Sequence, residues 1–165
     1  MVKVVVMGVS GSGKSSIGSA LAQRLEVPFV DADDLHPPAN KLKMASGSPL
    51  VDADRWPWLD AVGAALAAES SIVVACSALR LSYRDRLRVA APDAVFVHLH
   101  GSDALLTERL GARSHEFMPT TLLGSQLATL EPLEPGEAGF VVDIAPSPQQ
   151  IVDEIVRQLP EEAAR

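Results

Sequence analysis

Short apolar, β-branched runs recur along the chain and are separated by amphipathic segments. Residues 2–7 are almost wholly apolar, as expected of a strand that is buried on both faces. Four later runs have the same character, although the second is short. We therefore predict five strands, at residues 2–7, 28–30, 71–75, 94–99 and 140–144.

The intervening segments carry helix signals. Ile17, Leu21 and Leu25 recur at four-residue spacing and form one apolar helix face. Asp54, Ser102 and Thr120 are suitable N-caps, and Ser147 is followed by proline and then by Gln150, which indicates a capping box. Predicted helices lie at 39–45, 54–68, 102–113 and 120–130, around Tyr83 and Leu87, after residue 13, and from residue 147 onwards. Alternating strands and helices predict an α/β fold with a doubly wound parallel sheet, which binds ligands beyond the carboxyl ends of its strands.

Composition narrows the class of protein. The 165 residues suit one domain, and the net charge of −7 argues against a nucleic-acid partner. No apolar run is long enough to cross a bilayer, and the chain begins at its first strand, so we expect no membrane or targeting segment. The lone Cys76 has the character of a small core residue. It fits a reducing compartment, and a cytoplasmic location is expected.

The run Gly8-Val9-Ser10-Gly11-Ser12-Gly13-Lys14-Ser15 fits the phosphate-loop pattern and stands between a strand and a helix. Its glycines let backbone N–H groups converge on an anion, and the following helix adds its own N-terminal donors, including that of Ser16. Lys14 would reach the β- and γ-phosphates of ATP, and the Ser15 hydroxyl would ligate Mg²⁺. A plain Gly/Ser turn would explain the glycines but not Lys14 and Ser15 at this offset.

An acidic cluster follows the second predicted strand. Asp31 could face the water shell of Mg²⁺, while Asp33 could orient an acceptor hydroxyl and take its proton. The alternative is that these carboxylates are solvated or cap a helix. The phosphate loop one helix upstream favours the functional interpretation.

Residues 35–59 are rich in proline, glycine and charge and are placed to form an acceptor-binding flap. His36 could bond a polyol or carboxylate, or could cap the helix that follows it; the sequence leaves both open. Arg55 is a candidate for recognising an anionic acceptor. Trp56 and Trp58 are predicted to be packing anchors.

The third predicted strand is not followed by an acidic residue. In proteins with a phosphate loop, such a residue often holds the metal. Metal binding would then depend on Ser15, the phosphates, water and Asp31. Arg80 and Arg84 are four residues apart on one helix face, which suggests anion binding, although a solvated charged face is the alternative.

Arg109 and Arg113 are also four apart, at the end of a helix that enters an irregular segment. This arrangement is typical of a lid, here residues 109–122, whose arginines close on the phosphates. Arginines at a helix C-terminus also favour the helix dipole without further function.

Several blocks together resemble the small P-loop gluconokinases. The specific blocks include Asp-Asp-Leu-His-Pro at 33–37 and Cys-Ser-Ala-Leu-Arg at 76–80, and the likeness runs in order from residue 4 to about 145. The blocks lie at residues 7–15, 33–37, 43–50, 52–59, 76–80, 83–85, 117–119 and 125–126. Two positions depart from the family pattern: Glu116 stands where a histidine is expected, with His115 one place earlier, and Arg80 stands where lysine is common.

The resemblance implies transfer of the ATP γ-phosphate to the 6-hydroxyl of D-gluconate on a three-layer, nucleoside-monophosphate-kinase-like fold with a five-stranded parallel sheet and a small lid. Residues 8–16 would bind the nucleotide, and Asp33 would face the acceptor hydroxyl. Six residues would line the gluconate pocket: His36, Lys43, Arg55, Ser77, Arg80 and Arg84. Family members are often dimers, so a homodimer is a further expectation.

Three alternatives stay open. A shikimate kinase shares the paired aspartates after the second strand and also takes a carboxylated polyol. A regulatory GTPase is a weaker candidate, because Asn40-Lys41-Leu42-Lys43 lacks the closing aspartate of a guanine-reading motif. A degenerate nucleotide-binding structural protein would tolerate the loss of Lys14 or Asp33, and both are present.

Overall fold

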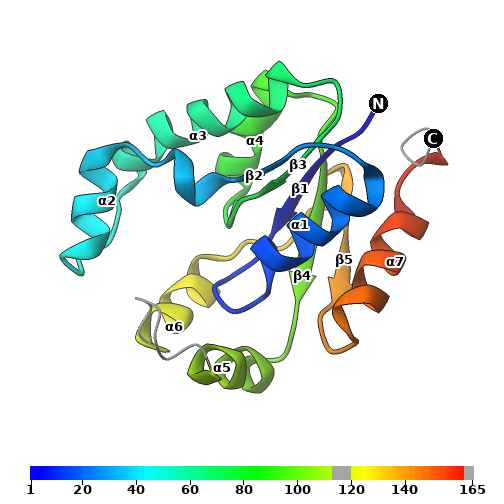
Figure 1. Cartoon of the computed structure of the whole chain (residues 1–165). Helices are drawn as coiled ribbons and strands as arrows, with labels where there is room; N and C mark the ends of the chain where they lie inside the picture. The colour runs from blue at the N-terminus through cyan, green and yellow to red at the C-terminus, as the bar shows by residue number, and fades with distance from the viewer. Residues whose placement is uncertain (113–119, 162–165) are drawn as a thin grey trace.

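The computed structural model describes residues 1–112 and 120–161, and within them five strands form one parallel sheet (Figure 1). The spatial order is β2-β3-β1-β4-β5, so β1 lies at the centre. This confirms the predicted α/β architecture. The strands are β1 (Lys3–Met7), β2 (Phe29–Asp31), β3 (Ile72–Ala75), β4 (Val95–His100) and β5 (Gly139–Asp143).

Helices cover both faces of the sheet and make the fold three-layered. In Figure 1, α3 and α4 cover one face, α1 and α7 cover the other, and α5 and α6 lie at the lower end. A 3₁₀ turn at Ala32–Leu35 follows β2. The helices are α1 (Lys14–Leu25), α2 (Pro38–Ala45), α3 (Asp52–Ala68), α4 (Leu81–Ala90), α5 (Asp103–Ala112), α6 (Thr120–Thr129) and α7 (Pro148–Gln158).

The alternation of side chains along β1 divides the core into two halves. Val4 and Val6 pack with α1 and α7, while Val5 and Met7 pack with α3 and α4. All four side chains are fully buried. A central parallel strand buried on both faces accounts for the uninterrupted apolar run in the sequence.

The predicted helix caps hold at two positions and differ at a third. Ser147 accepts a hydrogen bond from the N–H of Gln150 and Ser102 accepts one from Leu105, as expected. Asp54, predicted as an N-cap, lies in the first turn of α3, which begins at Asp52. Its carboxylate accepts the N–H of Val51 at 2.9 Å, so it still satisfies a donor at the helix start, but from inside the helix.

The strand register brings the functional segments to one edge of the sheet. Asp31 is paired with Ala75, and Met7 is paired with His98, so β1 to β4 end at similar heights. The loop after β1 lies at this edge, beside α5 and α6 in Figure 1. Within the described residues, the helices lack the combination of length and apolar character that a membrane crossing needs.

A substitution at Gly139 tests whether the close approach of β5 to β4 is needed for stability. A Cβ atom added at Gly139 would lie 2.2 Å from the backbone oxygen of Phe96, so Gly139→Ala must push the two strands apart. We expect a loss of about 1–3 kcal/mol in the free energy of unfolding in urea. Gly136→Ala is the matched control, because a Cβ there meets no atom within 4 Å, and equal stability of the two variants would contradict the prediction.

Candidate active site

The loop between β1 and α1 has the backbone geometry of a phosphate cradle. Gly11 and Gly13 have φ angles of 83° and 87°, which side chains strongly disfavour. A Cβ at Gly11 would also lie 3.0 Å from Cγ of Leu110, because α5 packs closely behind the loop. The sequence therefore uses glycine where the backbone has to turn and where a neighbouring helix approaches it.

Two side chains of the loop fit an anionic ligand. Ser12 is 1% exposed, and its Oγ has no hydrogen-bond partner among the described residues. A buried hydroxyl without a partner is costly unless a ligand or water completes it. The Lys14 ammonium group lies over the same loop, where it donates to the Val9 carbonyl at 3.2 Å. The donors of this loop thus suit the phosphates of a nucleotide.

The structure brings Ser15 and Asp31 together, as predicted for a metal site. The Ser15 hydroxyl donates to Oδ2 of Asp31 at 2.5 Å, which joins the first turn of α1 to the end of β2. Hydroxyl and carboxylate oxygens are ligands that Mg²⁺ accepts. The described residues hold no group of three or more acidic, histidine or cysteine side chains fit for a metal. A cation here would therefore take its other ligands from phosphate and water.

Asp33 lies two residues beyond Asp31, in the 3₁₀ turn that Asp31 caps, and its environment alters its acidity. Its backbone N–H donates to Oδ1 of Asp31 at 3.0 Å. Although Asp33 keeps exposed surface, desolvation by the surrounding protein raises the pKa of its carboxyl group, the charge of Asp31 raises it further, and Lys14 opposes both. A carboxylate with a raised pKa is better suited to accept a proton than an ordinary aspartate.

His36 has a packing role in the described structure. Its ring stacks on Trp58 with centroids 4.2 Å apart, and its Nδ1 lies 3.2 Å from Nδ2 of Asn40. Burial lowers the pKa of His36 to about 4, so the ring is neutral near pH 7. Trp58 donates from its indole to the Ala32 carbonyl at 2.7 Å, which confirms it as a packing anchor.

Lys43 is held by an ion pair that joins α2 to α3. Its ammonium group lies 2.7 Å from Oδ2 of Asp54, the same oxygen that accepts the Val51 N–H. This ion pair ties α2 to α3 across the segment that connects them.

Arg55 and Arg80 converge on one carboxylate. Both guanidinium groups approach Asp52, Arg55 at 3.4 Å and Arg80 at 3.8 Å, and the Tyr83 hydroxyl donates to Asp52 at 2.6 Å. The two guanidinium carbons also lie 5.5 and 5.9 Å from the centre of the Tyr83 ring. Two cations share one anion, so the cluster keeps a positive surplus that suits a second carboxylate. We name this group the arginine cluster: Asp52, Arg55, Arg80 and Tyr83.

The prediction that Arg84 lines the acceptor pocket is wrong. The Arg84 side chain is fully buried and forms a two-pronged ion pair with Glu137, with distances of 2.7 and 2.9 Å. Arg80 precedes α4 as its N-cap with an extended backbone, so the two arginines do not share a helix face, and the segment after α6 covers Arg84. Ser77, by contrast, does lie beside the phosphate loop, where its carbonyl accepts the Gly8 N–H at 3.4 Å.

The predicted lid is described only in part. Arg109 is half-buried and donates to the Ile144 carbonyl at 2.7 Å, beyond the end of β5. Arg113, His115 and Glu116 lie outside the described residues. Cys76 is buried, and burial raises the pKa of its thiol to about 12, which confirms it as an unreactive core residue.

Gln126 contacts the phosphate loop and was not predicted as a site residue. Its Oε1 accepts the backbone N–H of Ser10 at 2.6 Å, across 116 positions of sequence. Residues 125–126 carried part of the family resemblance, but a glutamine on a helix gives no local signal for such a contact. The loop is thus held by α6 as well as by α5.

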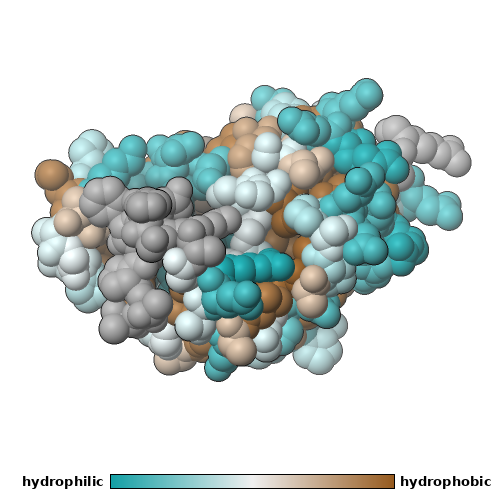
Figure 2. All heavy atoms as spheres, turned by 60° about the horizontal axis from the view of Figure 1, so that its bottom comes forward, coloured by the Kyte–Doolittle hydropathy of each residue, from teal (hydrophilic) through white to brown (hydrophobic). Residues whose placement is uncertain are grey.

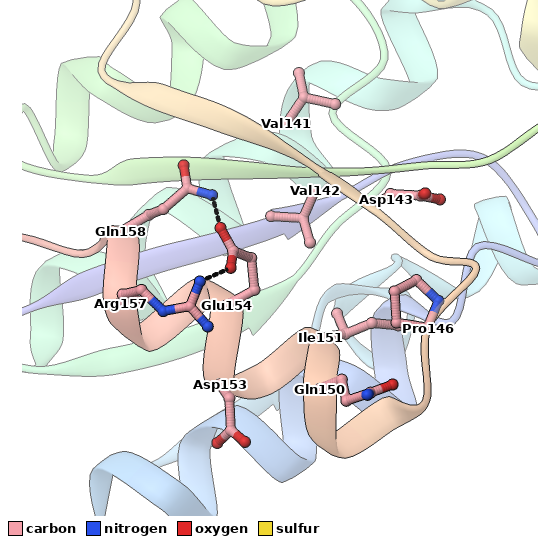
Figure 3. A pocket seen from close by; sticks show the side chains of 10 residues that line it. All are labelled: Val141, Val142, Asp143, Pro146, Gln150, Ile151, Asp153, Glu154, Arg157 and Gln158. Atoms are coloured by element: carbon pink, nitrogen blue, oxygen red, sulfur yellow. Dashed lines mark hydrogen bonds and ion pairs between the residues drawn. The ribbon is translucent and has the colours of Figure 1, made fainter.

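The protein also has a groove of about 690 Å³ between β5 and α7, shown in Figure 3. On the α7 side of the groove, Arg157 and Gln158 both contact Glu154. None of the residues that line it belongs to the phosphate loop or the arginine cluster. Figure 2 instead brings forward the end with α5 and α6, where hydrophilic and hydrophobic side chains are interspersed.

Comparisons with known proteins show the family of the chain. A shikimate kinase family model matches residues 10–160. A gluconokinase of Gluconobacter oxydans is 44% identical over 160 residues, which cover 93% of this chain and 89% of that protein. The chain belongs to the gluconokinase family. It is therefore an ATP-dependent kinase, which disfavours the GTPase switch and the structural protein as alternatives.

Solved structures agree with this family membership. A gluconokinase structure from Sinorhizobium meliloti 1021 has a TM-score of 0.86 at 51% identity and covers 93% of this chain and 88% of that one. A shikimate kinase from Aquifex aeolicus covers 98% of both chains, but with a TM-score of 0.58 at 18% identity it shows a common fold alone. The gluconokinase family thus has the closer likeness of the two.

Gln126→Ala tests whether the bond to Ser10 supports nucleotide binding. Loss of one acceptor to a backbone donor should raise the dissociation constant for Mg·ATP roughly three- to tenfold, measured by calorimetry. The control is Gln158→Ala on α7, since Gln158 bonds only to Glu154 in the described contacts. An unchanged ATP affinity in Gln126→Ala would show that the loop keeps its geometry without this contact.

Proposed function

We propose that this protein transfers the γ-phosphoryl group of ATP to the 6-hydroxyl of D-gluconate. The observation that carries the proposal is the position of Asp33. It lies next to the Ser15–Asp31 pair and within the electrostatic reach of Lys14. A carboxylate at this place can face both the phosphate site and an acceptor alcohol.

The nucleotide half of the site comprises residues 8–16. Their backbone N–H groups and the Lys14 ammonium would bind the β- and γ-phosphates and stabilise the charge that is transferred. Ser15 and Asp31 would hold Mg²⁺, which would neutralise part of the phosphate charge. Arg109 and Arg113 are proposed to contribute further positive charge from the lid, residues 109–122.

The acceptor half is proposed to comprise Asp33, Ser77 and the arginine cluster, on a flap formed by residues 35–59. Gluconate is a polyol with one carboxylate, so its pocket needs a cation at one end and hydrogen-bonding groups along its length. The positive surplus at Arg55 and Arg80 supplies the cation. Asp33 would orient the 6-hydroxyl and accept its proton as the phosphoryl group is transferred. Lys43 supports this half by joining α2 to α3. His36, directly after the 3₁₀ turn, supports it by stacking on Trp58 of α3.

Assay of the purified protein with Mg·ATP and gluconate tests the proposal. We expect a phosphorylated product whose ³¹P spectrum shows the phosphate coupled to the two protons of carbon 6. Shikimate in a parallel reaction is the control, and the family-model match makes it the relevant one. Faster turnover of shikimate, or phosphorylation at another hydroxyl, would overturn the proposal.

Asp33→Asn tests the role of the carboxylate. We expect kcat to fall at least ~100-fold with little change in ATP affinity, because the variant loses the proton acceptor but keeps the phosphate loop. The raised pKa of Asp33 predicts that the activity of the unaltered protein declines on the acid side with a midpoint above 3.8. Activity declines in this direction because Asp33, once protonated below its pKa, can no longer accept the proton of the acceptor hydroxyl. A variant that retained kcat and altered only the KM for gluconate would make Asp33 a positioning residue.

A further inference from the structure

The turn between β3 and α4, residues 76–80, has an unusual backbone. Ala78 has a φ of 43°, in the left-handed region that residues with a side chain rarely adopt. This conformation costs roughly 1 kcal/mol for a residue other than glycine. The residue is also fully buried. On either side of it lie Ser77 and Arg80, both on the proposed acceptor half, so a strained conformation persists next to the site.

Arg84 is placed to hold this conformation. Its Nη1 donates to the Ala78 carbonyl at 3.0 Å, and its Nη2 reaches the Pro132 carbonyl at 3.3 Å. Its charge is neutralised by Glu137, which is 6% exposed. Burial would raise the pKa of Glu137, but hydrogen bonds from Arg84, the Glu134 N–H and Arg88 lower it to about 2, so the pair is ionised. A planar, two-pronged pair of this kind has a fixed orientation.

A second set of contacts ties the same turn to the segment after α6. The Glu131 N–H donates to the Leu79 carbonyl at 2.7 Å, and the Leu81 N–H donates to the Glu131 carboxylate at 3.2 Å. The turn is therefore held on one side by Arg84 and on the other by Glu131. Directly before Ala78, the Ser77 carbonyl receives the N–H of Gly8, so the direction of the turn also bears on the phosphate loop.

We propose that Arg84, fixed by Glu137, is a positioning residue that keeps Ala78 in its left-handed conformation and thereby sets where Ser77 and Arg80 face the acceptor. This inference rests on the proposed function for the identity of the acceptor. Arg84 itself is buried and touches no substrate. Its effect is transmitted through the Ala78 carbonyl.

Arg88→Lys provides a matched control for Arg84→Lys. Arg88 also pairs with Glu137, and in addition with Asp85, but no described hydrogen bond joins it to Ala78. Both substitutions keep a positive charge and weaken the interaction with Glu137. A merely structural role of the ion pairs would give both variants the same kinetic behaviour.

Steady-state kinetics and urea unfolding of these variants test the proposal. We expect Arg84→Lys to raise the KM for gluconate roughly five- to tenfold while the KM for ATP stays within about twofold, because a lysine cannot hold the Ala78 carbonyl and both Glu137 oxygens together. Arg88→Lys should lower stability without changing the ratio of the two KM values. Adding Ala78→Gly to Arg84→Lys should restore most of the gluconate KM, since glycine adopts the left-handed conformation without strain.

A second variant and a crystal structure of the variant complete the test. If Arg84→Lys does not fold, Glu137→Gln is the second variant, and it should raise the gluconate KM in the same direction. A crystal structure of the variant reports the φ angle of Ala78 whichever substrate the protein uses. An unchanged ratio of KM values in an active variant, or an Ala78 that stays left-handed, would overturn the positioning role. Absence of gluconate turnover in the unaltered protein would instead overturn the proposed function.

Discussion

The site depends on where β1 ends. This strand lies between β3 and β4 and is buried on both faces, so its carboxyl end cannot shift without disturbing the whole sheet. The loop that follows has to turn sharply and bring backbone N–H groups together, which glycines with positive φ permit. Leu110 packs behind that loop and Gln126 bonds to it, so two helices from the later part of the chain complete a structure that begins at residue 8. A rigid strand thus presents a phosphate cradle at a fixed position.

An acidic protein that binds two anions has to concentrate its positive charge. The net charge is −7, yet α2, α3 and the start of α4 gather three cations, each with a carboxylate beside it. Asp52 holds Arg55 and Arg80, and Asp54 holds Lys43. These carboxylates fix the side chains before any ligand binds, which lowers the conformational entropy that binding would otherwise cost. Exposure separates the arginine cluster from the pair of Arg84 with Glu137: the side chains of Arg55 and Arg80 are 26% and 43% exposed, whereas Arg84 is fully buried.

The sequence predicts the parts of this protein whose signals are local. The five strands, the phosphate loop and the approach of Asp31 to Ser15 follow from periodicity, motif and the rule that parallel strands end at one edge. Arg84 was assigned wrongly because four-residue spacing predicts a helix face shared with Arg80, whereas Arg80 precedes α4 and the spacing does not show what covers Arg84. The cover comes from Glu137, 53 positions later. For His36 the sequence left two roles open, ligand binding and helix capping, and neither predicts the observed stack on Trp58, 22 positions away. Gln126 was missed for the same reason, since its contact spans the chain.

The phosphate loop and the arginine cluster, the two halves of the proposed site, are built on opposite faces of the sheet. The phosphate loop runs into α1 and packs against α5, whereas the arginine cluster lies on α3 and α4. Their relative position determines whether an acceptor hydroxyl can reach the γ-phosphate, and an error of about 1 Å can cost on the order of 100-fold in rate. The chain from α6 onwards contacts both: α6 bonds to Ser10 through Gln126, and Glu131 bonds to Leu79 in the turn that carries Ser77 and Arg80. Contacts outside the proposed binding groups therefore fix the distance between the phosphate loop and that turn.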